Sequence, residues 1–353
     1  MQSPPTASSL VIPTETTCVA RVTGASPPGE ELPNPNQTDL KYQLYGTDLG
    51  ILWATAEQKV MIAFGDSYGR KWGGAGAGPM SADWRSNTLA LSDDTDPTAG
   101  LSFTTMIQDK PGHAGDLIPA RRDSDEHTVI PTAGIAVGTR SYLYFMSVRQ
   151  WGAPNFWRTN LAGLAYSDDN GKTWVRSEKA VWKNSPQWDD PFQQGAFAKS
   201  GGFVYLFGTP NGRQGDIFLA RVPQAKVLEK AAYQYWDGQK WQANELSAVA
   251  VAKGPAGELS VAYNSFFHRW LMVALDADQK ALVLRDAAAL TGPWSTPTIL
   301  VTSADYPGLY GGYIDPLHND GKDLYFTLSQ WQPYNVFWMH SVLKLSRKSA
   351  PSR

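Results

Sequence analysis

The chain has 353 residues, of which 42% are hydrophobic, enough for one large domain or two ordinary ones with a substantial core. Its 31 basic and 33 acidic side chains give a net charge of −2, so the sequence lacks the basic character of a nucleic-acid-binding protein. The longest apolar run, residues 270–275, is far shorter than the roughly 20 residues that span a bilayer, which argues against a membrane-spanning protein.

The N-terminal segment, residues 1–37, is rich in proline, serine and threonine and contains no apolar signal-peptide core. Its composition favours a secreted or cell-surface protein whose signal peptide is absent from this sequence. We expect the segment to be partly extended, with a strand at about residues 18–22 that completes the last blade of the fold. Cys18, the single cysteine, lies in that strand, so internal disulfides and metal sites built from several thiolates are excluded.

Aromatic residues make up 12% of the chain, with 14 Trp, 15 Tyr and 13 Phe, and they accompany 32 Gly and 24 Pro. Aromatic side chains favour strands, whereas glycine and proline favour turns. A chain rich in both, with only 18% charged residues against about 25% in ordinary domains, is typical of an all-β protein. Exposed rings often stack on sugars, although the core of a propeller or barrel also uses many of them.

Short strands of apolar and aromatic residues recur along the chain after turns, and most have a candidate strand before and after them. Four short strands per unit, repeated five times, predict a five-bladed β-propeller at residues 38–345. The alternative is a pair of β-sandwiches, which also contain many short strands. Residues 346–353 are expected to be a disordered tail. The recurring strands are residues 60–64, 142–146, 203–207, 270–274 and 324–328.

The first unit brings two carboxylates together. Residues 48–55 and 60–66 are expected to form an antiparallel hairpin in which Asp48 lies opposite Ser67 and beside Asp66. Side chains at such neighbouring positions have Cβ atoms about 5 Å apart. Because adjacent carboxylates repel each other, one can stay protonated at neutral pH, as general acid catalysis requires. Both aspartates could instead be ordinary turn residues.

In a propeller, the innermost strand of each blade begins and the second strand ends at the rim of the central channel where most ligands bind. Polar and aromatic residues at these positions are therefore candidates for a carbohydrate cleft, with no metal or cofactor implied. Each of them could instead be a buried polar group with internal partners. The candidates are His127, Asp190, Gln193, Tyr313 and Asp315 at starts of inner strands, Trp151 and Trp331 at ends of second strands, and Trp84, Arg85 and Asn87 on a loop of the first blade.

Three further patterns are interpreted as structural. Residues 167–174 have the S-x-D-x-G-x-T-W form of the Asp-box turn found in sialidases and related propellers, which stabilises a blade on the far rim. The glycine-rich residues 73–78 lack the Lys-Ser/Thr of a phosphate-binding loop and are expected to form a mobile loop beside the cleft. Asp93, Asp94 and Asp96 could bind calcium, but acidic turns without an ion are commoner.

Five motifs in matching order resemble the bacterial endo-D-arabinanases of glycoside hydrolase family 183, formerly described as a domain of unknown function. The likeness covers about residues 38–345. It implies an endo-acting hydrolase of α-linked D-arabinofuranose chains, such as those of mycobacterial arabinogalactan and lipoarabinomannan, and it places the family's catalytic carboxylates on Asp48 and Asp66. The motifs are GTDLG at residues 46–50, AFGDS at 63–67, WRSN at 84–87, GTPNGR at 208–213 and GPW at 292–294.

By analogy with other five-bladed glycosidases, Asp48 is expected to be the nucleophile or base and Asp66 the general acid, and a short separation between them favours retention. The other candidates would bind a polysaccharide substrate, D-arabinan, through hydrogen bonds and ring faces, and the protein is expected to be a monomer. Two alternatives remain open. One is another furanosidase, such as an L-arabinanase or a fructan hydrolase, and the other is a non-catalytic carbohydrate-binding propeller, which would carry near-identical sites in every blade.

Overall fold

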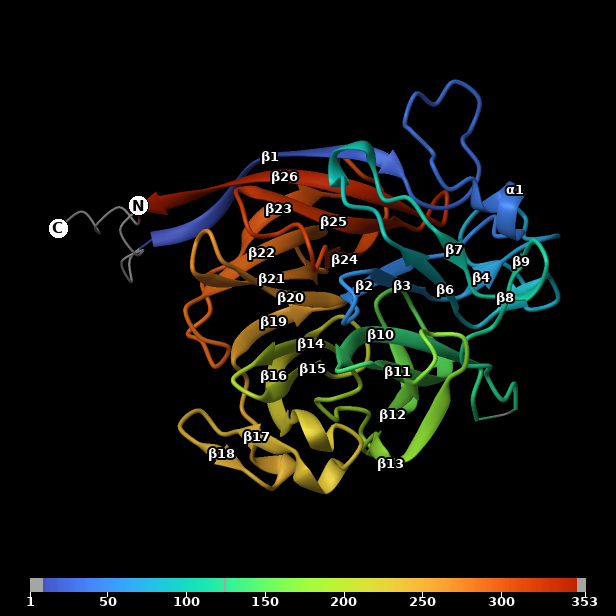
Figure 1. Cartoon of the computed structure of the whole chain (residues 1–353). Helices are drawn as coiled ribbons and strands as arrows, with labels where there is room; N and C mark the ends of the chain where they lie inside the picture. Colours follow the sequence, from blue (N-terminus) through green and yellow to red (C-terminus); the bar gives the residue numbers. More distant parts are fainter. Residues whose placement is uncertain (1–8, 124, 348–353) are drawn as a thin grey trace.

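The computed structural model describes residues 9–123 and 125–347, and these form the five-bladed β-propeller that the repeated strands predict (Figure 1). The innermost strands of the five blades meet in the middle of the molecule. From the innermost strand outward, blade 1 contains β2 (Leu49–Ala54), β3 (Val60–Phe64), β6 (Thr88–Ser92) and β7 (Thr105–Met106); blade 2 contains β10 (Thr128–Val137), β11 (Arg140–Trp151), β12 (Trp157–Ser167) and β13 (Val175–Lys183); blade 3 contains β14 (Gln194–Ser200), β15 (Phe203–Thr209), β16 (Gly215–Pro223), β17 (Gln234–Trp236) and β18 (Trp241–Gln242), with β19 (Ala252–Ala256) paired to β16; blade 4 contains β20 (Leu259–Asn264), β21 (Arg269–Asp276), β22 (Ala281–Ala287) and β23 (Thr298–Thr302); blade 5 contains β24 (Leu309–Ile314), β25 (Asp323–Gln330), β26 (Asn335–Arg347) and β1 (Ser9–Arg21).

Helical structure is confined to short segments that connect or flank the blades. The connections also contain two small antiparallel strand pairs, β4 with β5 and β8 with β9. These elements are α1 (Thr38–Tyr42), the 3₁₀ turns η1 (Pro97–Ala99), η2 (Gln224–Lys226), η3 (Lys230–Ala232) and η4 (Glu245–Ser247), and the strands β4 (Ser67–Tyr68), β5 (Trp84–Arg85), β8 (Gln108–Lys110) and β9 (His113–Ala114).

The first and last described strands close the ring. Strand β1 pairs antiparallel with β26 along its whole length, from Ser9 opposite Arg347 to Arg21 opposite Phe337, and Figure 1 shows β1 in blue lying along β26 in red. Strand β1 is much longer than the expected strand at residues 18–22. Strand β26 also includes Ser346 and Arg347, which the sequence places in the tail, because β1 supplies backbone partners there; residues 348–353 lie outside the described residues.

The core lies between blades as well as around the channel. All five residues of β3 are buried, because a central strand of a blade is covered by the neighbouring blades on both faces. This packing explains why the recurring strands appear as unbroken apolar runs instead of alternating apolar and polar residues. Large rings fill the layers between blades, among them Phe64, Tyr144, Trp182 and Trp338, each fully buried.

The β2–β3 hairpin contains a bulge that determines where Asp48 lies. Ala54 pairs with Val60, but the register shifts by one residue before Leu49 pairs with Phe64. The shift occurs at Gly50, whose φ of +79° suits glycine. As a result, the backbone of Asp48 faces Gly65, whose N–H donates to the Asp48 carbonyl at 3.2 Å, instead of the expected Ser67.

The Asp-box segment is a hydrogen-bonded turn between β12 and β13. The carboxylate of Asp169 accepts hydrogen bonds from the backbone N–H and the hydroxyl of Thr173, at 2.9 and 2.6 Å, and the indole N–H of Trp174 donates to the carbonyl of Gly171 at 3.0 Å. The ring of Trp174 packs edge-on against Trp53 of β2, which ties the turn to the innermost strand of the neighbouring blade.

Candidate active site

A cavity of about 780 Å³ lies at the end of the channel where the innermost strands begin, and every blade contributes to its wall. A cavity of this size is in the usual range for a small-molecule or oligomer site. The lining includes Asp48, Asp66, Tyr68 and Trp84 of blade 1, His127, Ile130, Met146, Trp151 and Trp157 of blade 2 and its connections, Gln194 and Arg213 of blade 3, Glu258, Leu275 and Lys280 of blade 4, and Tyr310, Tyr313, Trp331 and Tyr334 of blade 5.

Asp48 directly precedes β2 and is half-buried in the cavity wall. The hydroxyl of Tyr310 donates to its Oδ2 at 2.9 Å, whereas its Oδ1 is buried and has no hydrogen-bond partner among the described residues. A Cβ at Gly65 would lie only 2.3 Å from that Oδ1. The glycine of the Phe-Gly-Asp motif is therefore required for Asp48 to lie against the end of β3, next to Asp66.

Asp66 lies two residues beyond the end of β3 and is only 6% exposed. Its Oδ1 accepts a hydrogen bond from the indole N–H of Trp84 at 2.9 Å and another from the hydroxyl of Thr128 at 2.6 Å. Trp84 belongs to the connection of blade 1, and Thr128 is the first residue of β10 in blade 2. Asp66 is thus held from two blades.

The electrostatic surroundings make both carboxyl groups hold a proton more tightly than usual. Burial raises the pKa of Asp48 to about 7, and the charge of Asp66 adds to this rise, whereas the hydroxyls of Tyr310 and Tyr334 oppose it. Burial also raises the pKa of Asp66 to about 7, against the opposing hydrogen bonds from Thr128 and Trp84. Two such groups titrate as a pair, so near neutral pH the site can hold one carboxylate and one carboxylic acid.

A buried ion pair that the sequence candidates did not include lies beside Asp48. The guanidinium of Arg213 contacts Glu258 through Nη2 at 2.6 Å and through Nε at 3.1 Å, and it lies over the rings of Trp157 and Tyr310, with its central carbon 5.5 and 5.0 Å from the ring centroids. Glu258 directly precedes β20, so applying the inner-strand rule to blade 4 would have found it. Arg213 ends one of the five motifs.

Seven of the twelve residues that the sequence proposes for catalysis and binding line the cavity. Trp151 and Trp331 are 42% and 48% exposed at its mouth, on different blades, and His127 is exposed as well. The indole nitrogen of Trp157, another lining residue, is buried without a partner among the described residues, which makes it available to a ligand. The seven are Asp48, Asp66, Trp84, His127, Trp151, Tyr313 and Trp331.

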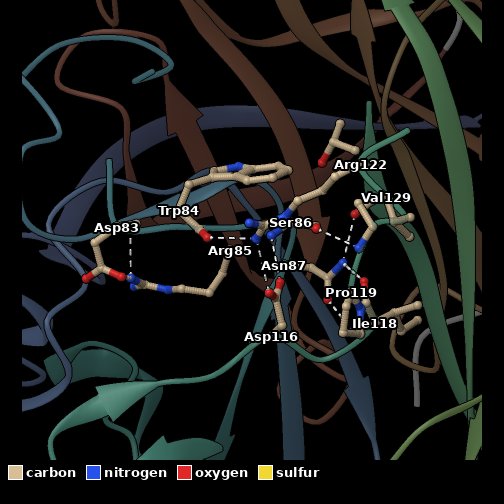
Figure 2. Close-up of polar contacts among 12 residues, drawn as sticks. Asp83, Trp84, Arg85, Ser86, Asn87, Asp116, Ile118, Pro119, Arg122 and Val129 are labelled. Atoms are coloured by element: carbon tan, nitrogen blue, oxygen red, sulfur yellow. Dashed lines mark hydrogen bonds and ion pairs between the residues drawn. The ribbon is translucent and has the colours of Figure 1, made fainter. Parts of the chain in front are cut away.

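Arg85 and Asn87 do not line the cavity, because their polar groups have partners inside the protein. Figure 2 shows the Arg85 side chain directed toward Asp83, with which it forms an ion pair at 2.9 Å, and away from the indole of Trp84. The Asn87 amide is fully buried and donates to the carbonyls of Ile118 and Val129 at 2.9 and 2.8 Å. Both residues support the segment that carries Trp84, and neither can reach a sugar in the cavity.

Asp190, Gln193 and Asp315 also lie outside the cavity lining. The Gln193 amide donates to Asp190 at 2.9 Å and accepts from a threonine hydroxyl, so the two side chains satisfy each other. Asp315 follows the end of β24, because that strand begins at Leu309 and not at Tyr313 as expected. The residue that faces the site near the start of β24 is Tyr310, and Asp315 pairs with His318 at 2.7 Å at the other end of the strand.

The loops that the sequence left open as ligand sites are accounted for differently. Ala77 and Gly78, at the end of the glycine-rich stretch, line the cavity. Within residues 9–123 and 125–347, no group of three or more His, Cys, Asp and Glu side chains is placed to hold a metal ion. Asp94 and Asp96 instead accept hydrogen bonds from their own loop, from Ser102 and Thr98. None of the described helices is long and apolar enough to cross a membrane.

Comparisons with solved structures identify proteins that share this fold. A crystal structure of a Bacteroides ovatus protein is similar with a TM-score of 0.61 and 11% identity, covering 89% of this chain and 90% of that one. Zg3597, a family 117 glycoside hydrolase from the marine bacterium Zobellia galactanivorans, is similar with a TM-score of 0.54 and 12% identity, covering 93% and 90%. At such identities the likeness shows the propeller fold alone.

Comparisons at the level of sequence are closer. Notoamide biosynthesis cluster protein J of Aspergillus sp. (strain MF297-2) is 30% identical over 314 residues, which cover 82% of this chain and 81% of that protein. The family model described as "Domain of unknown function (DUF4185)" matches residues 33–340, nearly the whole propeller with the segment before it. The chain therefore belongs to the DUF4185 family.

Proposed function

We propose that the protein is an endo-acting glycoside hydrolase that cleaves α-D-arabinofuranosyl linkages in D-arabinan, with Asp48 and Asp66 as its catalytic carboxyl groups. The observation that carries the proposal is the pair itself: two carboxyl groups with raised pKa values, held against each other in the wall of a large open cavity. Hydrolysis of a glycosidic bond needs one protonated and one ionised carboxyl group on either side of the bond.

The distribution of aromatic rings around the pair supports an internal cut in a chain. Trp151 and Phe156 are exposed on one part of the mouth, from blade 2, and Trp331 is exposed on another, from blade 5. Rings of this kind offer flat faces on which furanose units can stack. With Asp48 and Asp66 in the wall between these blades, sugar units can bind on both sides of the bond to be cleaved.

The choice of substrate rests on the sequence motifs and on the fold. The motifs that contain Asp48 and Asp66 resemble those of endo-D-arabinanases, and membership of the DUF4185 family is consistent with that resemblance. A glycoside hydrolase of family 117 has the same kind of propeller, which supports hydrolase chemistry on this scaffold. In this proposal Asp48 is the nucleophile or base and Asp66 the general acid, with retention of configuration.

The first test replaces each carboxyl group separately. Asp48→Asn and Asp66→Asn should each lower kcat on D-arabinan by about 10²–10⁴-fold, the usual contribution of acid–base catalysis, without loss of the folded state. Asp190→Asn is the matched control, because Asp190 is a half-buried carboxyl group outside the cavity lining, and it should keep wild-type activity. Near-normal activity of either Asp48→Asn or Asp66→Asn would show that the pair is not the catalytic pair.

The second test concerns the substrate and the stereochemistry. D-arabinan, L-arabinan and fructan are incubated separately with the protein, and the released oligosaccharides are analysed together with the anomeric form of the first product by proton NMR. Oligosaccharides from D-arabinan alone, with retained configuration, are the expected result. Products from L-arabinan or fructan alone would assign a different furanosidase, and binding without products would assign a carbohydrate-binding propeller.

A further inference from the structure

A chain of contacts leads from Glu258 to Asp48 across three blades. The carboxylate of Glu258 accepts two-point contacts from Arg213, at 2.6 Å from Nη2 and 3.1 Å from Nε. The guanidinium of Arg213 lies over the ring of Tyr310 at 5.0 Å, and the Tyr310 hydroxyl donates to Oδ2 of Asp48 at 2.9 Å. None of the described hydrogen bonds links Arg213 directly to Asp48.

The position of Arg213 is over-determined. Its ion pair is largely withdrawn from water, with 19% of the Arg213 side chain and 10% of the Glu258 side chain exposed. Its remaining donor, Nη1, contacts Oδ1 of Asn155 at 3.2 Å, and the second face of the guanidinium lies over Trp157. A Cβ at Gly257 would lie 2.8 Å from Cγ of Arg213, so the chain before Glu258 fits closely around it.

Such an arrangement is costly unless it does something besides stabilising the fold. Removing two charges from water consumes much of the energy that their attraction provides, so a buried ion pair is weak support for stability. The planar guanidinium, by contrast, is well suited to fix the ring that it covers. Here the covered ring is that of Tyr310, whose hydroxyl is the one side-chain donor printed on Asp48 among the described residues.

Building on the hydrolase function proposed above, we propose that the Glu258–Arg213 ion pair is a positioning unit that holds the Tyr310 hydroxyl on Oδ2 of Asp48 and leaves Oδ1 as the reacting oxygen. Oδ1 is buried and has no partner among the described residues. Arg213 acts through Tyr310 in this scheme, and its own donors are taken up by Glu258 and Asn155.

The groups that face Asp48 decide the direction of the expected effect. The Tyr310 hydroxyl lowers the pKa of Asp48, whereas the negative charges of Asp66 and Glu258 raise it. Attraction to Asp48 raises the pKa of Arg213, and the same attraction favours the charged form of Asp48. Loss of the Tyr310 contact should therefore raise the pKa of Asp48. The other titratable side chains near Asp48 are Tyr68, Tyr313 and Tyr334.

The test is a double-mutant cycle on the pH profile of kcat/KM. Tyr310→Phe removes only the hydroxyl, and Arg213→Lys keeps a positive charge but loses the two-point contact and the planar stack. Each should lower kcat/KM by about 10-fold and move the limb that reports Asp48 to higher pH by about one unit, the size expected for a hydrogen bond to a charged group. The double variant should be no worse than Tyr310→Phe alone.

Arg140→Lys is the matched control. Arg140 also makes a two-point contact with a carboxylate, Asp168, at 2.7 Å from both nitrogens, and its guanidinium also lies over a tyrosine ring, that of Tyr166, at 4.5 Å. It is not among the residues lining the cavity, so the pH profile should not change. If Arg213→Lys does not fold, Glu258→Gln replaces it in the cycle. An unchanged profile for the Arg213 or Glu258 variant, or effects that add to those of Tyr310→Phe, would overturn the proposal.

A readout without substrate separates this inference from the proposed function. The carboxyl carbons of ¹³C-labelled aspartate are titrated by NMR, and the Asp48 signal is assigned by its loss in Asp48→Asn. The Asp48 titration should move to higher pH in Tyr310→Phe and in Arg213→Lys. A protein that does not cleave D-arabinan but shows these shifts contradicts the proposed function and keeps the positioning unit, whereas an Asp48 titration that is the same in the wild type and Arg213→Lys refutes the unit itself.

Discussion

Replacing Asp66 with asparagine should make the stability of the protein less sensitive to pH between pH 5 and 8. Burial raises the pKa of this carboxyl group from 3.8 to about 7, so the folded state binds its proton more tightly than the unfolded chain does. A raised carboxyl pKa contributes stability at low pH that is lost as the pH rises toward the folded value. Asparagine can still accept the hydrogen bonds from Trp84 and Thr128 but carries no titrating proton.

The size of the effect follows from the two pKa values. Between pH 5 and pH 7 the unfolded Asp66 is ionised while the folded one is largely protonated, so the wild type loses about 1.4 kcal/mol of unfolding free energy per pH unit, or about 3 kcal/mol in all. Asp48 loses further stability in the same range, because its pKa is also raised. For a chain of this length, about 3 kcal/mol corresponds to about 6 °C in Tm.

The assay is thermal unfolding of the wild type and of Asp66→Asn at pH 5 and pH 8, followed by circular dichroism. The Tm of the variant relative to the wild type should be about 6 °C higher at pH 8 than at pH 5. Asp237→Asn is the control, because hydrogen bonds lower the pKa of Asp237 to about 2, so it is ionised in both states throughout this range. The same difference in Tm at both pH values for Asp66→Asn would refute the buried, proton-holding carboxyl group.

Two further changes test how the pair is held. Gly65→Ala would place a Cβ 2.3 Å from Oδ1 of Asp48, which must then retreat to at least 3.0 Å; because a misplacement of about 1 Å can cost about 100-fold in rate, kcat/KM should fall by about that factor. Gly321→Ala, where a Cβ has its nearest neighbour at 3.9 Å, should leave kcat/KM unchanged, and wild-type kinetics for Gly65→Ala would contradict the close contact. Trp84→Phe removes a donor that favours the charged form of Asp66, so the pH optimum of kcat/KM should move upward; an optimum that stays in place would show that this hydrogen bond does not set the acidity of the pair.

Much of the fold can be predicted from the chain because propeller blades are built from local antiparallel contacts. Each recurring strand pairs with the strands next to it in sequence, so composition, turn residues and the number of repeats suffice to predict five blades. The hairpin of residues 48–66 belongs to this class, and adjacency in one hairpin placed Asp48 near Asp66 without further information. The extent of β1 could not be predicted in this way, because its partner, β26, lies at the other end of the chain.

The rest of the site depends on contacts between blades. The inner-strand rule selected Tyr313 and Asp315, but it is the start of β24 at Leu309 that brings Tyr310 to Asp48, 262 positions earlier in the chain. Arg213 meets Glu258 only because blade 3 and blade 4 are neighbours around the ring.

The sequence by itself therefore determines the all-β character, the five blades and the pairing of two aspartates in one hairpin, since these follow from neighbours along the chain. Only the tertiary structure decides how those aspartates ionise and which side chains face them. Burial in the channel wall raises the pKa values of Asp48 and Asp66, and the donors that oppose the rise, Tyr310 and Thr128, come from other blades. Desolvation and long-range hydrogen bonds are properties of the closed ring, which no local pattern of residues contains.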